Sequence, residues 1–344
     1  MERARERKMK DILNRLINHE TISTEEAKQV IVNISNDMYN PSQITCFLSV
    51  FMMRSITIEE LKGFKDALLE LCVSINLNDF NAVDIVGTGG DGKNTFNIST
   101  LSAFITAGAG VNVSKHGNYG VSSTSGSSNV MEYLGVKFSN NEDFLRGCIN
   151  KAGICILHAP LFHPAMKNVA PIRRELGVKT FFNMLGPLVN PSFPKNQMLG
   201  VFSLELLRLY SFIYQNTNTN YNIVYALDGY DEISLTGKAK IVSNHTEKLF
   251  SPEDLGLVKI KQDAIFGGNT VKDAAKIFVD IISGNATEAQ NNVVCANAGL
   301  AIATTKQISH QDGFEMAKES LFSGKAKGSL DKLIELSKKL EVRS

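Results

Sequence analysis

The chain has 344 residues, of which 43% are hydrophobic and 21% are charged, which is enough to form the cores of two domains. Its formal net charge of +1 gives no electrostatic reason to expect nucleic acid or a membrane as the main partner. Apolar runs stay shorter than the ~18 residues of a membrane span, and the charged N-terminus lacks the apolar centre of a signal peptide. The five cysteines form no C-x-x-C pair, so we expect a reduced, cytoplasmic protein without a zinc site.

The N-terminal part of the chain is predicted to be entirely helical. Ser23 with Glu26 and Thr57 with Glu60 have the spacing of capping boxes, and Asn40-Pro41 combines a cap residue with a first-turn proline. Apolar-periodic runs such as CFLSVFMM and FKDALLELC lie between these signals. The pattern predicts a small helical domain; the alternative is that these helices are the outer layer of one larger domain.

From about residue 80, short strand-like runs alternate with helical patterns. The strand-like runs are AVDIV, VNVSK, VKF, ICILHA, MLGVF and NIVYALD, with helices predicted near 98–108 and 125–134 and further helices out to 340. Such alternation predicts an α/β fold with a mainly parallel sheet covered on both faces. Ligands of these sheets bind beyond the carboxyl ends of the strands, so the loops after AVDIV, VNVSK and NIVYALD are expected at one rim.

The stretch DIVGTGGDGKNTFNIST, residues 84–100, resembles two phosphate-binding motifs. Its glycines match the dinucleotide fingerprint G-x-G-x-x-G, but no acidic residue follows about 20 positions later. It also matches a P-loop, except that Asn94 replaces the hydroxyl residue after Lys93. Asp91 would repel phosphate unless it binds ligand hydroxyls or water around a metal. The glycines therefore indicate an anion site without selecting the molecule.

Two further segments at the predicted rim carry polar side chains. KHGNYGVSSTSGSSNVMEYLG, residues 115–135, is rich in small hydroxyl side chains that suit an oxygen-rich anion. A helix start near 125–127 would add a second helix dipole, so a ligand with phosphates at two ends is expected. Asp231 and Glu232 follow the strand NIVYALD, and beside a polyphosphate they would be natural Mg²⁺ ligands.

Together these motifs resemble those of the anthranilate phosphoribosyltransferases. GTGGD, NIST, KHGN, SGS, HPAMKNVAPIRRELGVKTFFNMLGPLVNP and DGYDE occur in order, and the resemblance extends to the closing SGKAKGSLDKL. It implies a small all-helical domain at 1–75, joined by about 165–190, and a larger α/β domain at 76–344 that binds phosphoribosyl pyrophosphate. It also implies ligands in the cleft between the domains and a homodimer formed through the helical domain. One departure is Asn129, where an acid is expected.

The resemblance implies transfer of the phosphoribosyl group of phosphoribosyl pyrophosphate to the amine of anthranilate, with Mg²⁺, in tryptophan biosynthesis. It implies Mg²⁺ ligands Ser99, Asp231 and Glu232, and no single acid or base residue, because the aromatic amine is already neutral. Asn118 and Arg173 would contact anthranilate, with His116 and His163 as walls of its pocket. The substrate-binding residues implied are Gly87, Gly90, Asp91, Thr95, Asn97, Ile98, Ser99, Thr100, Lys115, His116, Gly117, Asn118, Ser122, Ser123, Ser127, His163 and Arg173.

Some neighbouring residues are interpreted as structural. We expect Arg174 to be a surface charge and His158 a packing residue. Phe181, Phe182 and Met184 are expected to belong to the core. Three other functions remain possible: a pyrimidine nucleoside phosphorylase, disfavoured by KHGN in place of a KHSGR-like segment; a nucleic-acid-binding relative, disfavoured by the charge balance; and an ATPase, disfavoured by Asn94.

Overall fold

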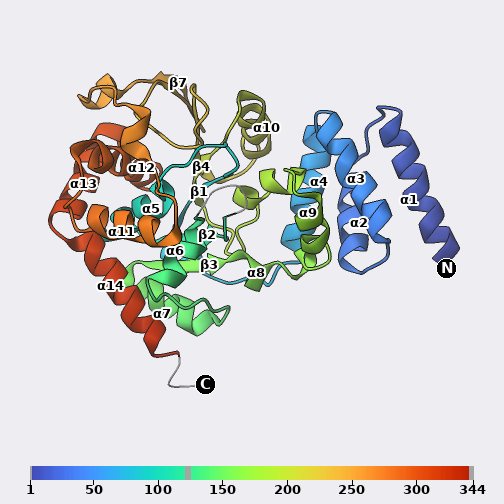
Figure 1. Cartoon of the computed structure of the whole chain (residues 1–344), viewed down its shortest axis with the longest axis horizontal. Helices are drawn as coiled ribbons and strands as arrows, with labels where there is room; N and C mark the ends of the chain where they lie inside the picture. The colour runs from blue at the N-terminus through green and yellow to red at the C-terminus, as the bar shows by residue number, and fades with distance from the viewer. Residues whose placement is uncertain (1, 121–124, 341–344) are drawn as a thin grey trace. The chain divides into compact units, whose positions relative to one another are not determined.

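The computed structural model describes residues 2–120 and 125–340, with side chains from Met9 onward (Figure 1). The chain forms two compact units. A helical unit comprises residues 1–74 and 159–191, and an α/β unit comprises residues 75–158 and 192–344. The segment that returns to the helical unit lies between the third and fourth strands of the sheet.

Four helices of the N-terminal segment and several short elements of residues 159–191 build the helical unit. These are α1 Glu2–Ile17, α2 Thr24–Ser35, α3 Pro41–Met53, α4 Ile58–Glu70, α8 Ala159–Phe162 and α9 Ala170–Leu176, with 3₁₀ turns η2 Pro164–Met166, η3 Phe181–Met184 and η4 Gly186–Leu188. The predicted capping boxes at the starts of α2 and α4 are both confirmed, and α3 begins at Pro41 after the cap residue Asn40.

A cluster of aromatic rings joins the two segments of the helical unit. Phe181 stacks on Phe64 of α4, with ring centroids 4.3 Å apart, and makes edge contacts with Phe47 and Phe51 of α3. All four side chains are buried. Aromatic pairs in these geometries add to the stability that comes from burial alone. The segment 159–191 is therefore part of this unit's core, and Phe181 is a core residue as predicted.

The helical unit also contains a buried ion pair. Glu60, in the first turn of α4, is fully buried and accepts hydrogen bonds from both terminal nitrogens of Arg54, at 2.5 and 3.1 Å. The same carboxylate accepts the backbone N–H groups of Thr57 and Ile22. One carboxylate thus caps α4 and neutralises a nearly buried guanidinium.

The α/β unit is built on a seven-stranded sheet in the order β3-β2-β1-β4-β5-β6-β7. Its strands are β1 Val83–Gly87, β2 Val113–Gly117, β3 Ile154–His158, β4 Asn196–Gly200, β5 Asn220–Ala226, β6 Ala239–Ser243 and β7 Glu247–Phe250. The first five strands are parallel, and β6 and β7 are added antiparallel at one edge. The prediction of a mainly parallel sheet in an α/β fold is confirmed.

Helices cover both faces of this sheet. The helices are α5 Ile98–Gly108, α6 Ser127–Tyr133, α7 Glu142–Ala152, α10 Leu204–Tyr214, α11 Val271–Ile282, α12 Glu288–Lys306, α13 His310–Phe322 and α14 Lys325–Lys338, with 3₁₀ turns η1 Asn78–Phe80, η5 Pro252–Leu255 and η6 Gln262–Ile265. On β5, Tyr221 packs against Tyr214 of α10, whereas the next residue, Asn222, donates to Thr304 of α12. Since successive side chains of a strand point to opposite faces, α10 and α12 cover opposite faces (Figure 1).

Two strand predictions need correction. VKF, residues 136–138, is not a strand: it lies between α6 and α7, where the ring of Phe138 stacks on His158 at 4.4 Å. The run is too short to form a ladder, and Asn141 soon begins α7 as its cap. The antiparallel pair β6–β7 was not predicted, because the exposed β7 carries two charged residues and no regular apolar alternation.

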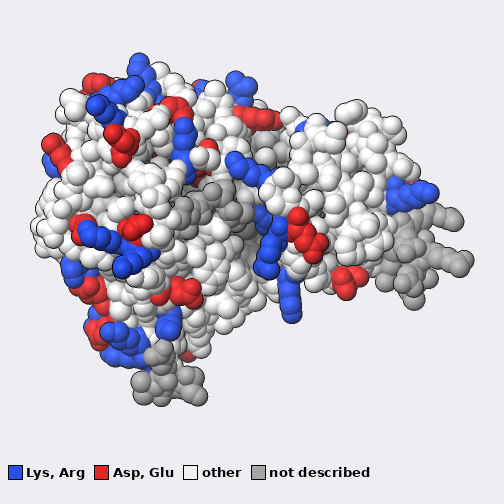
Figure 2. All heavy atoms as spheres, in the orientation of Figure 1, with Lys and Arg blue, Asp and Glu red and all other residues white. Residues whose placement is uncertain are grey.

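The surface of the α/β unit mixes charges of both signs. Figure 2 shows Lys and Arg interspersed with Asp and Glu over this unit. Many are paired, including Lys327 with Asp331 and Lys325 with Glu319. This face does not have the basic stripe typical of nucleic-acid-binding proteins. Within the described residues, we find no helix with the length and hydrophobicity needed to span a membrane.

The ion pair in the helical unit leads to a prediction about stability. Glu60→Ala should lower the free energy of unfolding by about 3–5 kcal/mol, because Arg54 would remain buried without its counter-charge. The exposed neighbour Glu59 is a matched control, and Glu59→Ala should change the unfolding free energy by less than about 0.5 kcal/mol. Urea denaturation of the two variants measures the difference. Equal losses would show that the buried pair contributes nothing specific.

Candidate active site

The strand order predicts a ligand crevice between β1 and β4. From β1 the chain passes through α5 to β2 on one side, and from β4 it passes through α10 to β5 on the other side. Connections that leave neighbouring strands in opposite directions separate beyond the carboxyl ends of those strands. The crevice therefore begins where β1 and β4 end, at Gly87 and Gly200.

Two paired glycines let an acidic residue lie across these strand ends. Gly87 and Gly200 are partners in the β1–β4 register. A Cβ at Gly87 would overlap the Asp231 carboxylate, and a Cβ at Gly200 would overlap the Asp231 carbonyl oxygen. Only glycine at both positions permits this approach. The loop after β5 thereby brings Asp231 beside the glycine loop after β1.

The glycine loop has the backbone geometry of an anion-binding nest. Gly89, Gly90 and Gly92 adopt left-handed conformations with φ of 62°, 72° and 76°. The backbone N–H of Gly89 donates to Asp231 Oδ2 at 2.7 Å. Turns of this kind aim successive N–H groups toward one side of the chain, where they bind carboxylate or phosphate oxygens.

Asp231 and Glu232 form a crowded acidic pair at this rim. Glu232 Oε1 accepts the backbone N–H of Ser99 at 3.1 Å, in the first turn of α5, where a negative charge is favourable. Burial raises the pKa of Asp231 to about 6, with a further contribution from nearby Asp91. Burial also raises the pKa of Glu232 well above its usual range, with contributions from Asp231 and Asp91. A bound cation would relieve this repulsion.

These carboxylates fit a Mg²⁺ ion shared with a phosphate ligand. Within residues 2–120 and 125–340, no three His, Cys, Asp or Glu side chains gather closely enough to hold a metal by themselves. Mg²⁺ commonly binds one or two carboxylates, with water and substrate phosphate oxygens as the remaining ligands. Asp231 and Glu232 suit that incomplete protein donor set.

Lys115 places a positive charge beneath the same rim. Its side chain is 2% exposed, and Nζ donates to the carbonyl oxygen of Ile85 at 2.6 Å and lies 3.5 Å from Ser99 Oγ. Burial lowers its pKa to about 8, against the opposing effect of Asp84 and Glu232. A buried ammonium at a strand end is suited to an anionic ligand.

Two hydrogen bonds hold described residues on either side of the stretch 121–124. Asp84 in β1 is fully buried and accepts the backbone N–H of His116 at 3.1 Å. Asn97, just before α5, donates to the carbonyl oxygen of Ser125 at 3.1 Å. These bonds place β2 beside β1 and Ser125 beside the start of α5. The glycine loop and the KHGN segment are therefore neighbours, as predicted.

The start of α6 is organised by Asn129. Its Oδ1 accepts the backbone N–H groups of Gly120 and Gly126 at 2.9 and 3.0 Å. Ser127 Oγ donates to the carbonyl oxygen of Asn118 at 3.2 Å. An amide oxygen can accept both N–H groups without adding a negative charge, so Asn129 can satisfy the N–H of the cap residue Gly126 in place of an acid. Ser122 and Ser123 fall outside the described residues.

The predicted site residues divide between the two units. His163 and Arg173 belong to the helical unit. The α/β unit gathers the other described residues at the ends of β1 and β2 and in the loop after β5: Gly87, Gly90, Asp91, Thr95, Asn97, Ile98, Ser99, Thr100, Lys115, His116, Gly117, Asn118, Ser127, Asp231 and Glu232. The side chains of Ile98 and Thr100 are buried, so these two residues offer mainly backbone groups.

The two helical-unit residues differ in exposure. Arg173, in α9, is partly buried, lies 5.4 Å from the centre of the Phe182 ring and donates to Asn183 Oδ1 at 3.2 Å. Burial lowers its pKa. Its neighbour Arg174 is exposed, as predicted for a surface charge. His163 is buried, which lowers its pKa to about 4, so its ring is neutral at pH 7.

Three structural residues of the site were not predicted from the sequence. Gly200 lies within the run MLGVF, and its role requires knowing that β4 neighbours β1. Asp84 is an acid inside the apolar run AVDIV, a pattern that could have indicated a buried acceptor. Asn129 follows a serine-rich stretch at the spacing of a capping box.

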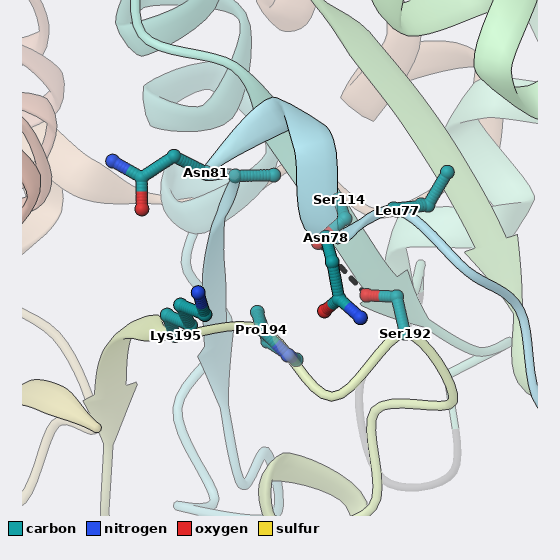
Figure 3. Close-up of a pocket in the computed structure, with 8 residues that line it drawn as sticks. Leu77, Asn78, Asn81, Ser114, Ser192, Pro194 and Lys195 are labelled. Carbon is teal, nitrogen blue, oxygen red and sulfur yellow. Dashed lines mark hydrogen bonds between the residues drawn. The ribbon is translucent and has the colours of Figure 1, made fainter. Parts of the chain in front are cut away.

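A pocket found in the α/β unit lies away from this crevice. It is a small hollow, and Figure 3 shows Ser114 and Ser192 joined by a hydrogen bond beside it. Its lining includes Ala82, just before β1, and Lys195, just before β4. These residues precede the strands, whereas ligands of such sheets bind at the opposite, carboxyl ends.

Comparison with known proteins agrees with this geometry. Residues 79–327 match the model described as "Glycosyl transferase family, a/b domain", and residues 10–72 match "Glycosyl transferase family, helical bundle domain". An anthranilate phosphoribosyltransferase of Flavobacterium johnsoniae is 66% identical over 329 residues, covering 96% of this chain and 100% of that protein. One of Bacteroides fragilis is 52% identical and likewise covers 96% of this chain and 100% of its own length.

Solved structures show the same fold. The crystal structure of anthranilate phosphoribosyltransferase from Thermus thermophilus matches with a TM-score of 0.88 and 31% identity, over 95% of this chain and 99% of its own. The enzyme from Saccharomyces cerevisiae in complex with PRPP and Mg matches with a TM-score of 0.86 and 26% identity, over 96% and 98% of the two chains. The resemblance inferred from the motifs is confirmed: this chain belongs to the anthranilate phosphoribosyltransferase family.

Proposed function

We propose that this protein transfers the phosphoribosyl group of phosphoribosyl pyrophosphate to the amine of anthranilate, giving phosphoribosyl anthranilate and pyrophosphate. This reaction belongs to the synthesis of tryptophan from chorismate. The observation that carries the proposal is the crevice at Gly87 and Gly200. There a left-handed glycine loop, an acidic pair and a buried lysine meet. The similar yeast structures contain PRPP and Mg in one case and 4-fluoroanthranilate in another.

The residues of the α/β unit suit the leaving group. The left-handed glycine loop and the N-terminal dipole of α5 would suit a diphosphate, and Lys115 adds a positive charge close to Ser99. As the bond between ribose C1 and the pyrophosphate oxygen breaks, C1 gains oxocarbenium character and the pyrophosphate gains negative charge. Fixed amides stabilise that charge without reorganising during the reaction.

Mg²⁺ would be held by Asp231, Glu232 and the Ser99 hydroxyl, and when bound it neutralises charge on the phosphate oxygens. Burial raises the pKa of both acids, and Asp91 raises it further, so a cation bound here would stabilise their charged forms. Asp91 contributes to both shifts and is suited to the ribose hydroxyls or to water around the metal.

Anthranilate needs positioning more than activation. Its amine is neutral at pH 7 and attacks C1 directly, so no residue is required as a strong base. Arg173 is proposed to bind the anthranilate carboxylate, with Asn118 as a second contact and His116 and His163 as pocket walls. The partial burial of Arg173 beside Phe182 supports this role, because a partly desolvated guanidinium binds a carboxylate more strongly than an exposed one.

The direct test is the fluorescence of anthranilate in the presence of purified protein, phosphoribosyl pyrophosphate and Mg²⁺. Fluorescence should decay only when all three additions are present, because the product forms only from the complete set. A folded protein that gives no decay over a range of Mg²⁺ concentrations and pH would contradict the proposal. Phosphorolysis of thymidine and uridine would then be the next assay.

Arg173 and Arg174 form a matched pair for testing the anthranilate contact. Arg173→Ala should raise KM for anthranilate by at least about tenfold, the loss expected when a charged hydrogen-bond donor is removed. Binding of phosphoribosyl pyrophosphate should be unchanged. Arg174→Ala removes an exposed charge from the same helix and should behave as wild type. Equal weakening of both substrates by Arg173→Ala would refute its assigned role.

The acidic pair leads to a prediction about metal dependence. The double variant Asp231→Asn with Glu232→Gln should raise the Mg²⁺ concentration needed for half-maximal turnover by at least about tenfold. Removing direct metal ligands should weaken metal binding at least as much as removing residues that only hydrogen-bond to such ligands. Asp263→Asn changes an exposed acid of the same unit and serves as the control. The measurement is the initial rate of each variant as a function of Mg²⁺ concentration. If the double variant needs no more Mg²⁺ than wild type, Asp231 and Glu232 are not the metal ligands.

A cytoplasmic homodimer is part of the proposal. The helical unit exposes Ile17, Met52 and Met53, with Met53 86% exposed, and apolar side chains of this kind suit an interface between copies. All five cysteines are free thiols, which fits a reducing compartment. Light scattering of the purified protein reports the number of chains in the assembly.

A further inference from the structure

We propose that Asn94 is a positioning residue that holds the C-terminal end of the glycine loop and thereby strengthens binding of phosphoribosyl pyrophosphate. The proposal rests on the function proposed above, because it concerns the loop that receives the diphosphate. Asn94 occupies the position where a P-loop carries its metal-binding hydroxyl. Here its side chain is bonded to a different segment of the chain instead.

The glycine loop needs support from outside itself. Gly89, Gly90 and Gly92 all adopt left-handed conformations, and glycine restricts the backbone less than any other residue. A Cβ at Gly89 or Gly92 would meet no atom within 4 Å, so no other segment packs against the middle of the loop at these positions. Within the loop Lys93 N–H donates to Asp91 Oδ1 at 2.9 Å, and the two ends of the loop are bonded to other segments.

The N-terminal end is held by the sheet and by Asp231. Gly87 is the last residue of β1, and the N–H of Gly89 donates to Asp231 at 2.7 Å. The C-terminal end is held by a short antiparallel ribbon. Phe96 N–H donates to the Ile265 carbonyl oxygen at 3.2 Å, and Gly267 N–H donates to the Asn94 carbonyl oxygen at 2.8 Å.

Close packing of the two backbones fixes the register of this ribbon. Thr95 and Phe266 form an antiparallel bridge. Gly267 lies so close that a Cβ on it would overlap the Thr95 carbonyl oxygen. Only the backbone of Gly267 fits beside Thr95, which fixes the register of the ribbon next to the loop.

The Asn94 side chain extends this ribbon by one more bond. Its Nδ2 donates to the Gly268 carbonyl oxygen at 2.9 Å. Gly268 has φ of 85° and lies against Asp273, whose carboxylate accepts the N–H groups of Asn269 and Thr270. These bonds cap the start of α11. Asn94 thus connects the end of the glycine loop to a capped helix.

Loss of this bond should loosen the loop without removing a substrate contact. A side-chain hydrogen bond contributes modestly to stability, so the fold should persist when it is lost. The loop is expected to hold the diphosphate equally in the bound substrate and in the transition state. Weaker loop order should therefore raise KM for phosphoribosyl pyrophosphate and leave kcat nearly unchanged.

The matched control is Asn112, just before β2 and away from the carboxyl ends of the strands. Asn112 Nδ2 donates to the Phe80 carbonyl oxygen at 2.9 Å, and this residue is also partly buried. Asn112→Ala and Asn94→Ala therefore remove the same kind of bond, one far from the loop and one at its end. Asn94→Leu keeps side-chain bulk at the loop while removing the donor.

We expect Asn94→Ala and Asn94→Leu to raise KM for phosphoribosyl pyrophosphate about fivefold, with kcat and KM for anthranilate within about twofold of wild type. Asn112→Ala should leave all three constants unchanged. Backbone amide exchange of residues 88–96 should be faster in both Asn94 variants than in Asn112→Ala. This exchange is measured without substrate.

The two measurements separate the proposals. If wild-type protein turns over substrate but the Asn94 variants match Asn112→Ala in KM, the role of Asn94 is refuted and the function stands. If the wild-type protein does not convert the substrates, the proposed function fails. Backbone amide exchange of the loop then still tests whether Asn94 holds its C-terminal end. If the backbone amides of residues 88–96 exchange at the same rate in the Asn94 variants as in Asn112→Ala, the positioning role of Asn94 is refuted in either case.

Discussion

The contact on which the site depends is the approach of Asp231 to the ends of β1 and β4. It requires glycine at two positions on neighbouring strands, because a Cβ at Gly87 or Gly200 would occupy the space of the Asp231 carboxylate or carbonyl. Once Asp231 is there, it accepts the Gly89 N–H and orients the glycine loop. The next residue, Glu232, reaches the first turn of α5. One loop thus organises both parts of an anion site.

This arrangement conflicts with the stability of the protein in the absence of ligand. Burial disfavours the charged forms of Asp231 and Glu232, and their acidic neighbours raise both pKa values further. The positive charge of Lys115 lowers the pKa of Glu232, but by less than burial and the neighbouring acids raise it. Function explains the conflict: a site that binds a metal and a diphosphate must hold opposite charges close together before either ligand arrives.

Much of the architecture followed from local sequence patterns. The capping boxes at Ser23 and Thr57 and the Asn40-Pro41 start depend on residues three or fewer positions apart, so the sequence alone identified three helix starts. Strands β1 to β5 were recognised because both their faces are covered and their apolar runs are nearly continuous. VKF was a wrong prediction, because an apolar side chain such as Phe138 can pack without belonging to a ladder.

Long-range features of the site were harder to predict. The sequence marked the glycine loop, the KHGN segment and Asp231-Glu232 as polar loops at strand ends, and family motifs grouped them. It did not reveal Gly200, whose importance appears only through pairing with Gly87. Nor did it reveal the bond from Asn94 to Gly268, which joins residues 174 positions apart. Such contacts depend on strand order and chain packing, which short motifs do not encode.

The discontinuity of the helical unit has a consequence for how the protein is made. Phe181 completes the aromatic core that Phe47, Phe51 and Phe64 begin, yet it emerges from the ribosome more than one hundred residues after them. During that interval α3 and α4 carry an incomplete apolar core, and strands β1 to β3 are synthesised before it closes. The nascent chain must therefore keep unfinished surfaces of both units from associating wrongly, a demand that a contiguous helical domain would avoid.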